Sequence, residues 1–141
     1  MADVVDTLVL DTSRLSKRKQ ASPWLYYAVR LLNISDGTGE SGVIKVDKST
    51  LVAFDGAEPA KLAVEEILCS IQGFTSVRLY WHHDVNDEIC VLSGNDYRNY
   101  SEVPLVDPAS AGGTGDILLT TAGTTSGNTY DITLILRLMD N

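Results

Sequence analysis

The chain has 141 residues, of which 44% are hydrophobic and 21% are charged, and its formal net charge is −8. A chain of this length and balance buries a real core and needs no metal or disulfide to fold. An acidic surface is repelled by phosphate groups, so we expect no nucleic-acid partner and no attraction to anionic lipid. The chain shows no 18-residue apolar stretch and no signal-peptide pattern. We therefore expect a soluble protein, made in the cytoplasm, without a membrane partner.

Short runs rich in Val, Ile, Leu, Thr and Tyr alternate along the chain with turns rich in Gly, Asn and Asp. This spacing is typical of sandwiches and barrels. In chain order, the expected strands are 7–10, 24–33, 42–47, 61–71, 76–82, 87–92, 116–121 and 130–139. The pattern predicts one all-β domain spanning 1–141, an antiparallel β-sandwich of the immunoglobulin-like or jelly-roll-like type.

The last expected strand is the clearest, because its residues alternate strictly between two faces. One face carries Tyr130, Ile132, Leu134, Leu136 and Leu138, and the other carries Asp131, Thr133, Ile135, Arg137 and Met139. We expect 116–121 to be its hairpin partner across a Gly-rich turn. Segment 61–71 fits a strand or a helix, and its neighbours favour a strand. Asp47 is placed to cap one helical turn.

Two segments are expected to be irregular. Segment 11–22 holds a basic cluster, and 97–108 contains Pro104 and Pro108, which disfavour a central strand. We interpret 11–22 as a basic loop or arm that docks on an acidic neighbouring subunit. Tyr and Arg are enriched at protein interfaces. The candidate partner-contact residues are Arg14, Lys17, Arg18, Lys19, Tyr97, Arg98 and Tyr100.

His82, His83 and Asp84, followed by Asp87 and Glu88, are the residue types that ligate metals. An exposed turn between two strands explains the same residues, and we favour it. We therefore predict no metal site, no cofactor and no catalytic residues, and we expect that the protein is not an enzyme. A hydrolase using His82 or His83 stays open, because catalytic triads form in space and not in sequence.

Cys69 and Cys90 both lie in apolar runs, where buried free thiols are the favoured interpretation. A disulfide between paired strands also stays open.

Four segments resemble a family of small virion proteins of tailed bacteriophages. They are 33–41 (NISDGTGES), 46–51 (VDKSTL), 113–121 (GTGDILLTT) and 126–132 (SGNTYDI). The resemblance runs from about Leu8 to Leu138 and rests on turns and strand edges. It implies a β-sandwich that decorates or cements the capsid shell, without a catalytic motif. Segment 11–22 looks longer than the family's usual first loop.

The leading hypothesis is a bacteriophage virion structural protein, a capsid decoration or cement protein that stabilises the head shell by protein–protein contacts. Its partners would be the major capsid protein or other virion proteins, and it would form a homo-oligomer, such as a trimer, in the virion. One alternative is a tail, connector or fibre-adaptor subunit. Another is a carbohydrate- or receptor-binding module, since exposed aromatic side chains stack on sugars.

Overall fold

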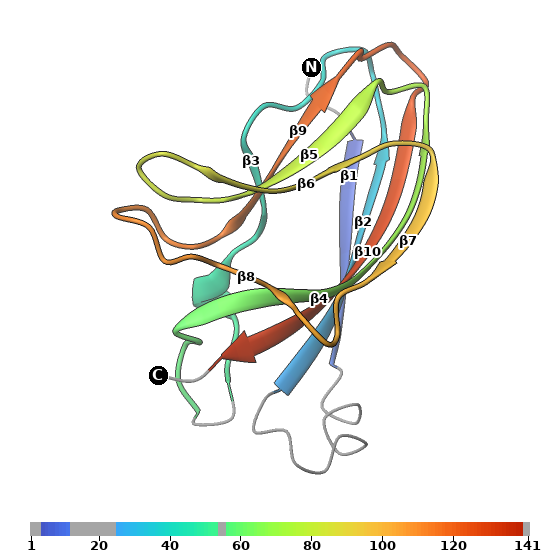
Figure 1. Ribbon diagram of the computed structural model, residues 1–141. Coiled ribbons are helices and arrows are strands. Elements are labelled where there is room, and N and C mark those ends of the chain that lie inside the picture. Colours follow the sequence, from blue (N-terminus) through green and yellow to red (C-terminus); the bar gives the residue numbers. More distant parts are fainter. Residues whose placement is uncertain (1–3, 12–24, 54–55, 140–141) are drawn as a thin grey trace.

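The computed structural model describes residues 4–11, 25–53 and 56–139 (Figure 1), and no side chain before Tyr26 is described. All regular elements but one short turn are strands. They are β1 (Val4–Asp11), β2 (Leu25–Ile34), β3 (Val43–Val46), the 3-10 turn η1 (Lys48–Thr50), β4 (Lys61–Gln72), β5 (Ser76–Trp81), β6 (Asp87–Leu92), β7 (Asn95–Asn99), β8 (Leu105–Val106), β9 (Ile117–Ala122) and β10 (Thr129–Met139).

The strands form two antiparallel sheets that pack face to face (Figure 1). The first sheet has the order β1-β2-β10-β4-β7, and β8 also pairs with β4; the second has the order β3-β9-β5-β6. Leaving aside β1 and β8, successive strands change sheet at every connection except β5 to β6. This is the strand order of a jelly roll. The predicted all-β antiparallel sandwich is confirmed.

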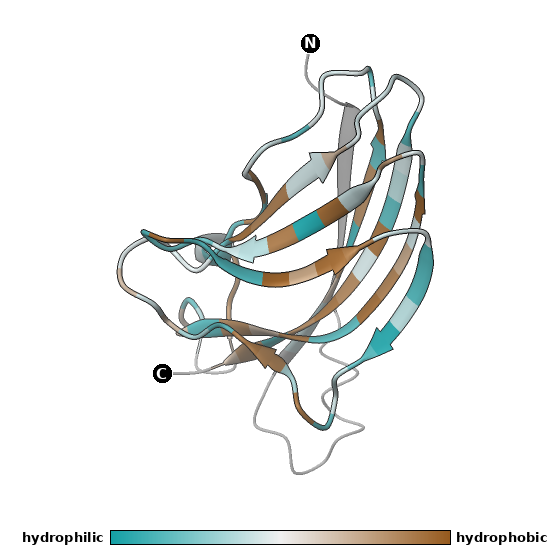
Figure 2. Cartoon of the chain, turned by 45° about the horizontal axis from the view of Figure 1, so that its top comes forward, coloured by the Kyte–Doolittle hydropathy of each residue, from teal (hydrophilic) through white to brown (hydrophobic). Residues whose placement is uncertain are grey.

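Both sheets turn their apolar side chains inward to a shared core. Hydrophobic and hydrophilic residues accordingly alternate along several strands (Figure 2). In β10, Tyr130, Ile132, Leu134, Leu136 and Leu138 are at most 1% exposed, and the residues between them are partly exposed. In β5, Val77, Leu79 and Trp81 are likewise buried in the core, at 2% exposure or less, and alternate with more exposed residues. These two alternations were expected from the sequence, and both are confirmed.

Segment 61–71 is a strand, as predicted, but a β-bulge interrupts its alternation. Ile135 pairs with Glu66 and Leu136 with Val64, so the register between the two strands skips Glu65, which is the extra residue of the bulge. The bulge changes the phase of the strand, and both Val64 before it and Ile67 after it face the core. This change of phase explains why the sequence of this segment was ambiguous between a strand and a helix.

The predicted hairpin between 116–121 and the last strand is wrong. β9 pairs with β3 and β5, whereas β10 pairs with β2 and β4. Both strands have an inner apolar face, and their connection crosses from one sheet to the other. Hairpins and sheet-crossing connections look alike in sequence because each joins two amphipathic strands through a polar, Gly-rich turn.

Segment 97–108 is more regular than predicted, because β7 and β8 both pair with β4. β7 carries Asn, Asp, Tyr and Arg, so it has no apolar alternation to reveal it. Pro104 lies just before β8, at the margin of the sheet, where proline is tolerated. The predicted cap is confirmed: the side chain of Asp47 accepts a hydrogen bond from Ser49 N at the start of η1.

Among the described residues, no helix is long and apolar enough to cross a membrane.

Candidate functional site

The candidate partner-contact residues fall into two groups. Arg14, Lys17, Arg18 and Lys19 lie outside the described residues. Tyr97, Arg98 and Tyr100 lie on β7 or directly after it, at the free margin of the first sheet. The structure therefore places the second group together, and it gives the three side chains different environments.

Tyr97 is the most exposed of the three, at 56%. Its hydroxyl donates to Glu66 Oε1 at 2.5 Å, and this hydrogen bond raises the pKa of Tyr97. Arg98 turns to the neighbouring sheet: Nη2 donates to the carbonyl of Val91 on β6, at 3.1 Å, and Nε donates to Asp96 Oδ2. Tyr100 is partly buried against the core. Only Tyr97 is therefore fully available to a partner.

Large apolar side chains lie exposed along this margin, and we call the set the edge surface. Leu68 on β4 is paired directly with Tyr97 on β7, and the two are 55% and 56% exposed. Val103, in the loop after β7, is 77% exposed, and Val106 on β8 is 37% exposed. A cluster of exposed apolar side chains at a sheet margin is characteristic of an interaction surface.

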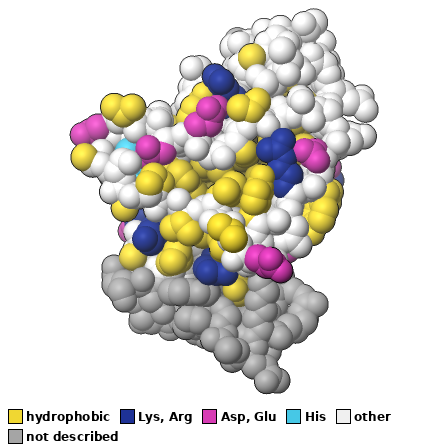
Figure 3. Space-filling model, viewed as in Figure 1, with side chains coloured by type: hydrophobic (Ala, Val, Ile, Leu, Met, Phe, Trp, Pro, Cys, Tyr) yellow, Lys and Arg dark blue, Asp and Glu magenta, His cyan; other side chains and the backbone are white. Residues whose placement is uncertain are grey.

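A shallow groove adjoins the edge surface on the open side of the sandwich, between β6 and β8. It is lined by Trp81, Asp87, Glu88, Ile89, Pro104, Leu105, Val106 and Pro108. Figure 3 shows hydrophobic side chains gathered in the middle of this face, with charged groups around them. The apolar character of the edge surface thus continues into the groove.

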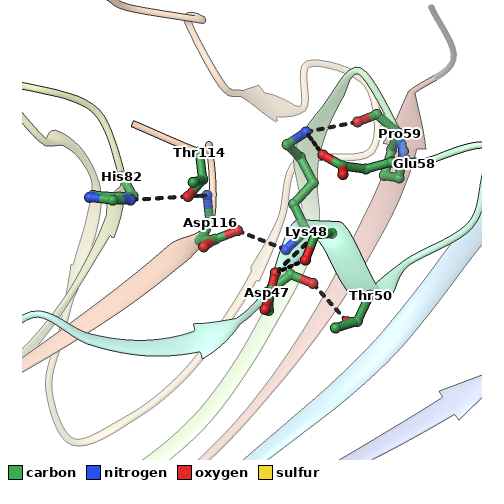
Figure 4. Close-up of polar contacts among 9 residues, drawn as sticks. Asp47, Lys48, Thr50, Glu58, Pro59, His82, Thr114 and Asp116 are labelled. Carbon is green, nitrogen blue, oxygen red and sulfur yellow. Dashed lines mark hydrogen bonds and ion pairs between the residues drawn. The ribbon is translucent and has the colours of Figure 1, made fainter. Parts of the chain in front are cut away.

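Three loops meet at one end of the sandwich, which we call the histidine end. The turn after β5 carries His82 and His83, the loop before β9 is Gly-rich, and η1 begins with Lys48. The hydroxyl of Thr114 meets His82 Nδ1 at 3.0 Å, and Asp116 Oδ1 accepts from Lys48 N at 2.8 Å. Figure 4 draws both contacts as dashed lines. The Gly-rich loop is therefore held between the histidine turn and η1.

Lys48 also joins η1 to the segment before β4. Its Nζ lies 2.5 Å from Glu58 Oε2 and 3.0 Å from the carbonyl of Pro59 (Figure 4). Asp47, Lys48, Ser49, Glu58, Thr114 and Asp116 line a polar depression beside these contacts. Because the Lys48 charge is matched by Glu58, the contacts serve to fix the loops.

His83 is 7% exposed and lies between two acceptors. Its Nδ1 is 2.8 Å from the carbonyl of Gly112, and its Nε2 is 2.6 Å from Asp107 Oδ1. Asp87 Oδ2 lies 3.9 Å from the same Nε2. Burial acts to lower the pKa of His83, but the Gly112 hydrogen bond, the contact and charge of Asp107 and the charge of Asp87 together raise it. Both ring nitrogens face acceptors, so the imidazolium form fits this geometry.

The imidazole of His83 and the carboxylates of Asp87 and Asp107 each offer one ligand atom, and the three atoms lie within 4.8 Å of one another. The sequence singled out His83 and Asp87 as metal-ligating types and favoured an exposed turn for them. That turn is only partly exposed, because His83 is buried. Asp107 could not be found from sequence, since it reaches His83 from a loop 24 residues away.

The two histidines face different groups. His83 faces a carbonyl and a carboxylate, and its side chain is buried. His82 Nδ1 contacts the hydroxyl of Thr114. A triad needs a nucleophile, a base and a third group that orients the base, and a hydrolase using either histidine stays a prediction.

A second buried charge cluster joins Lys45, Glu40 and Tyr130 in the core. The Lys45 and Glu40 side chains are 2% and 4% exposed, and their Nζ and Oε2 atoms lie 2.5 Å apart. The hydroxyl of Tyr130 donates to the other oxygen, Glu40 Oε1, at 2.5 Å. Lys45 is the extra residue of a bulge in β3, which accounts for a charged side chain turned to the core.

Cys69 and Cys90 are both buried and free, as the favoured interpretation held. Burial raises the pKa of Cys90 to about 12, and it also raises the pKa of Cys69. Both thiols are therefore protonated at neutral pH, and protonated thiols are poor nucleophiles and poor metal ligands.

Comparisons with protein-family models, with curated proteins and with solved structures found no match to this chain.

Proposed function

We propose that this protein is a structural protein of a bacteriophage virion, a decoration or cement protein that stabilises the head shell through protein–protein contacts. Its partner is the major capsid protein or another virion protein. The protein acts in many copies and associates as a homo-oligomer such as a trimer.

The edge surface is the observation that carries this proposal. Leu68, Tyr97, Val103 and Val106 are exposed together at a sheet margin to which no further described strand is paired. Unpaired backbone at such a margin can accept a strand from a neighbour, and exposed apolar side chains gain free energy when a neighbour covers them. Both forms of contact suit assembly on a larger surface.

The charge of the chain adds to this argument. Copies that each carry a formal net charge of −8 repel one another when crowded on a shell. Apolar contacts and backbone hydrogen bonds are attractive irrespective of that charge. The jelly-roll topology is also shared with many viral capsid domains, which supports the proposal by fold-level analogy alone.

Co-sedimentation with purified head shells tests the proposal. The wild-type chain is expected to sediment with the shells, and Leu68→Asp and Tyr97→Asp are expected to reduce the bound fraction strongly. Val85→Asp is the matched control, because Val85 is 82% exposed but lies in the turn at the histidine end. Circular dichroism of each variant verifies that the fold is retained.

Counting copies in purified virions by quantitative mass spectrometry completes the test. Hundreds of copies per particle support a shell protein, and a handful support the alternative of a tail, connector or fibre-adaptor subunit. Virions without this protein would refute the proposal. Glycan binding that is lost in Tyr97→Ala, without shell binding, would favour a carbohydrate- or receptor-binding module instead.

A further inference from the structure

Three side chains at the histidine end point at one small volume from three separate segments. His83 belongs to the turn after β5, Asp87 begins β6, and Asp107 lies in the loop after β8. Asp107 is 3% exposed and His83 is 7% exposed, so two of the three are almost fully removed from water. Such convergence of buried polar groups needs a physical reason, because each of them loses hydration on folding.

The hydrogen bond at the far side of the imidazole defines which nitrogen faces the two carboxylates. Nδ1 meets the carbonyl of Gly112 and must carry a proton to make that bond. The lone pair of the neutral ring is then on Nε2, which faces Asp107 and Asp87. A histidine whose other nitrogen is held by a backbone carbonyl is the usual arrangement behind a metal ligand.

The carboxylate of Asp87 is the least complete part of this cluster. Its side chain is 31% exposed, but its Oδ2 is buried and has no hydrogen-bond partner among the described residues, with His83 Nε2 3.9 Å away. An imidazolium between two carboxylates leaves one negative charge unmatched. A divalent cation with a neutral imidazole and two carboxylates brings the sum to zero, and the nearby Lys48 charge is already matched by Glu58.

The distances suit an ion of the zinc class. Metal–ligand distances of about 2.0–2.1 Å in a tetrahedron place neighbouring ligand atoms about 3.3 Å apart. The observed separations from Nε2, 2.6 Å to Asp107 and 3.9 Å to Asp87, lie on either side of that value. Each of these two separations has to change by less than about 1 Å to reach the tetrahedral value, and the three ligand atoms already lie within 4.8 Å of one another. One imidazole and two carboxylates also favour Zn²⁺ over Mg²⁺ or Ca²⁺, which prefer oxygen ligands alone.

We propose that His83, Asp87 and Asp107 form a binding site for a divalent zinc-class ion, which replaces the proton between His83 and Asp107. The ion ties the turn after β5, the first residue of β6 and the loop after β8 into one unit. Three protein ligands leave a fourth position for water. This proposal does not rest on the virion role, although Asp87 also lines the groove that adjoins the edge surface.

Calorimetric titration of the untagged, chelator-treated chain with Zn²⁺ tests the site. One Zn²⁺ is expected to bind per chain. Asp87→Asn is expected to weaken binding at least about 10-fold, because the loss of even an indirect supporting partner has that effect. This variant is preferred to changes at His83 or Asp107, since Asp87 Oδ2 has no hydrogen bond to lose among the described residues. We therefore expect the fold to be retained, and circular dichroism verifies it.

Two matched variants show whether the ion binds at this place. Asp84→Asn removes the same charge from the same turn, and His82→Asn removes the only other histidine of the chain. Both are expected to bind Zn²⁺ as the wild type does. Binding of Co²⁺ gives a second readout, since a four-coordinate site produces intense visible absorption that Asp87→Asn abolishes.

Three outcomes would overturn the proposal. They are no saturable Zn²⁺ binding by the wild type, wild-type affinity in Asp87→Asn, and loss of binding in His82→Asn or Asp84→Asn. Binding of Mg²⁺ or Ca²⁺ as tightly as Zn²⁺ would contradict the assigned class of ion.

Discussion

The Lys45–Glu40–Tyr130 cluster and the His83–Asp107–Asp87 cluster both bury charged side chains, but they use their carboxylate oxygens differently. Glu40 accepts from Tyr130 with one oxygen and contacts Lys45 with the other, so its charge is matched and both oxygens are bonded. At the histidine end, Asp107 is bonded, whereas a buried oxygen of Asp87 has no hydrogen-bond partner among the described residues.

This difference separates a structural cluster from a site prepared for a ligand. Burying a charge costs free energy, and complete partners offset that cost within the folded chain. In the Lys45–Glu40–Tyr130 cluster the charges are matched and both carboxylate oxygens have partners. We therefore interpret it as a structural contact that fixes the loop before β3 against β10. The His83–Asp107–Asp87 cluster holds one carboxylate more than its imidazolium can match, which is the property expected of a site that receives a cation.

The largest effect is expected when the complete cluster is broken. Glu40→Ala leaves the Lys45 ammonium buried, at 2% exposure, without its counter-ion. Removing one partner of a buried ion pair typically costs about 3–5 kcal/mol of the free energy of unfolding. Urea denaturation followed by fluorescence measures this loss, and the result is expected to be the same with or without Zn²⁺.

A double variant serves as the control for this prediction. Lys45→Met combined with Glu40→Ala removes both charges, so its cost is expected to be smaller than the sum of the two single costs. If the two costs are additive, the pair is not coupled and the cluster is not the closed unit described above.

An intermediate effect is expected from glycines that lie near the two clusters. Gly113 (φ +67°), at the histidine end, and Gly42 (φ +60°), shortly after Glu40, both have left-handed backbones. A Cβ at Gly113 would lie 2.4 Å from the carbonyl oxygen of His82, whereas nothing lies within 4 Å of one at Gly42. Gly113→Ala is therefore expected to cost about 1–3 kcal/mol more than Gly42→Ala.

Thermal and urea unfolding of this pair separate backbone strain from crowding, because strain is common to both variants. Equal costs would mean that the Gly-rich loop moves away from the histidine turn without loss. The packing at the histidine end would then be less firm than that around Glu40.

The fold could be predicted from the sequence wherever a strand alternates without interruption, as β10 and β5 do. The prediction failed where the pattern is broken by a bulge or is shared by two topologies. Lys45 and Glu65 are both extra residues at bulges, and both bury a charged side chain. No alternation rule places such residues, because the bulge itself depends on the pairing with the neighbouring strand.

The residues of the candidate sites also divide into those that are close in sequence, which could be predicted, and those that only the fold brings together, which could not. Tyr97 was found from its residue type and its neighbourhood, but its exposed partner Leu68 lies on another strand and was not. His83 and Asp87 are four residues apart and were noticed together. Asp107 joins them only because the jelly roll brings the loop after β8 back to the turn after β5.

The smallest effect is expected from Asp87→Asn in the presence of a chelator. The substitution removes a charge whose buried oxygen makes no hydrogen bond within the part of the chain that the structure describes, and it relieves repulsion between Asp87 and Asp107. It also removes a favourable charge 3.9 Å from His83, so the two changes oppose each other. The free energy of unfolding is expected to stay within about 0.5 kcal/mol of the wild type. A loss well above 1 kcal/mol in chelator would mean that Asp87 already serves as a full counter-ion of His83. The histidine end would then be a closed structural cluster like that of Glu40, and the contrast between the two would disappear.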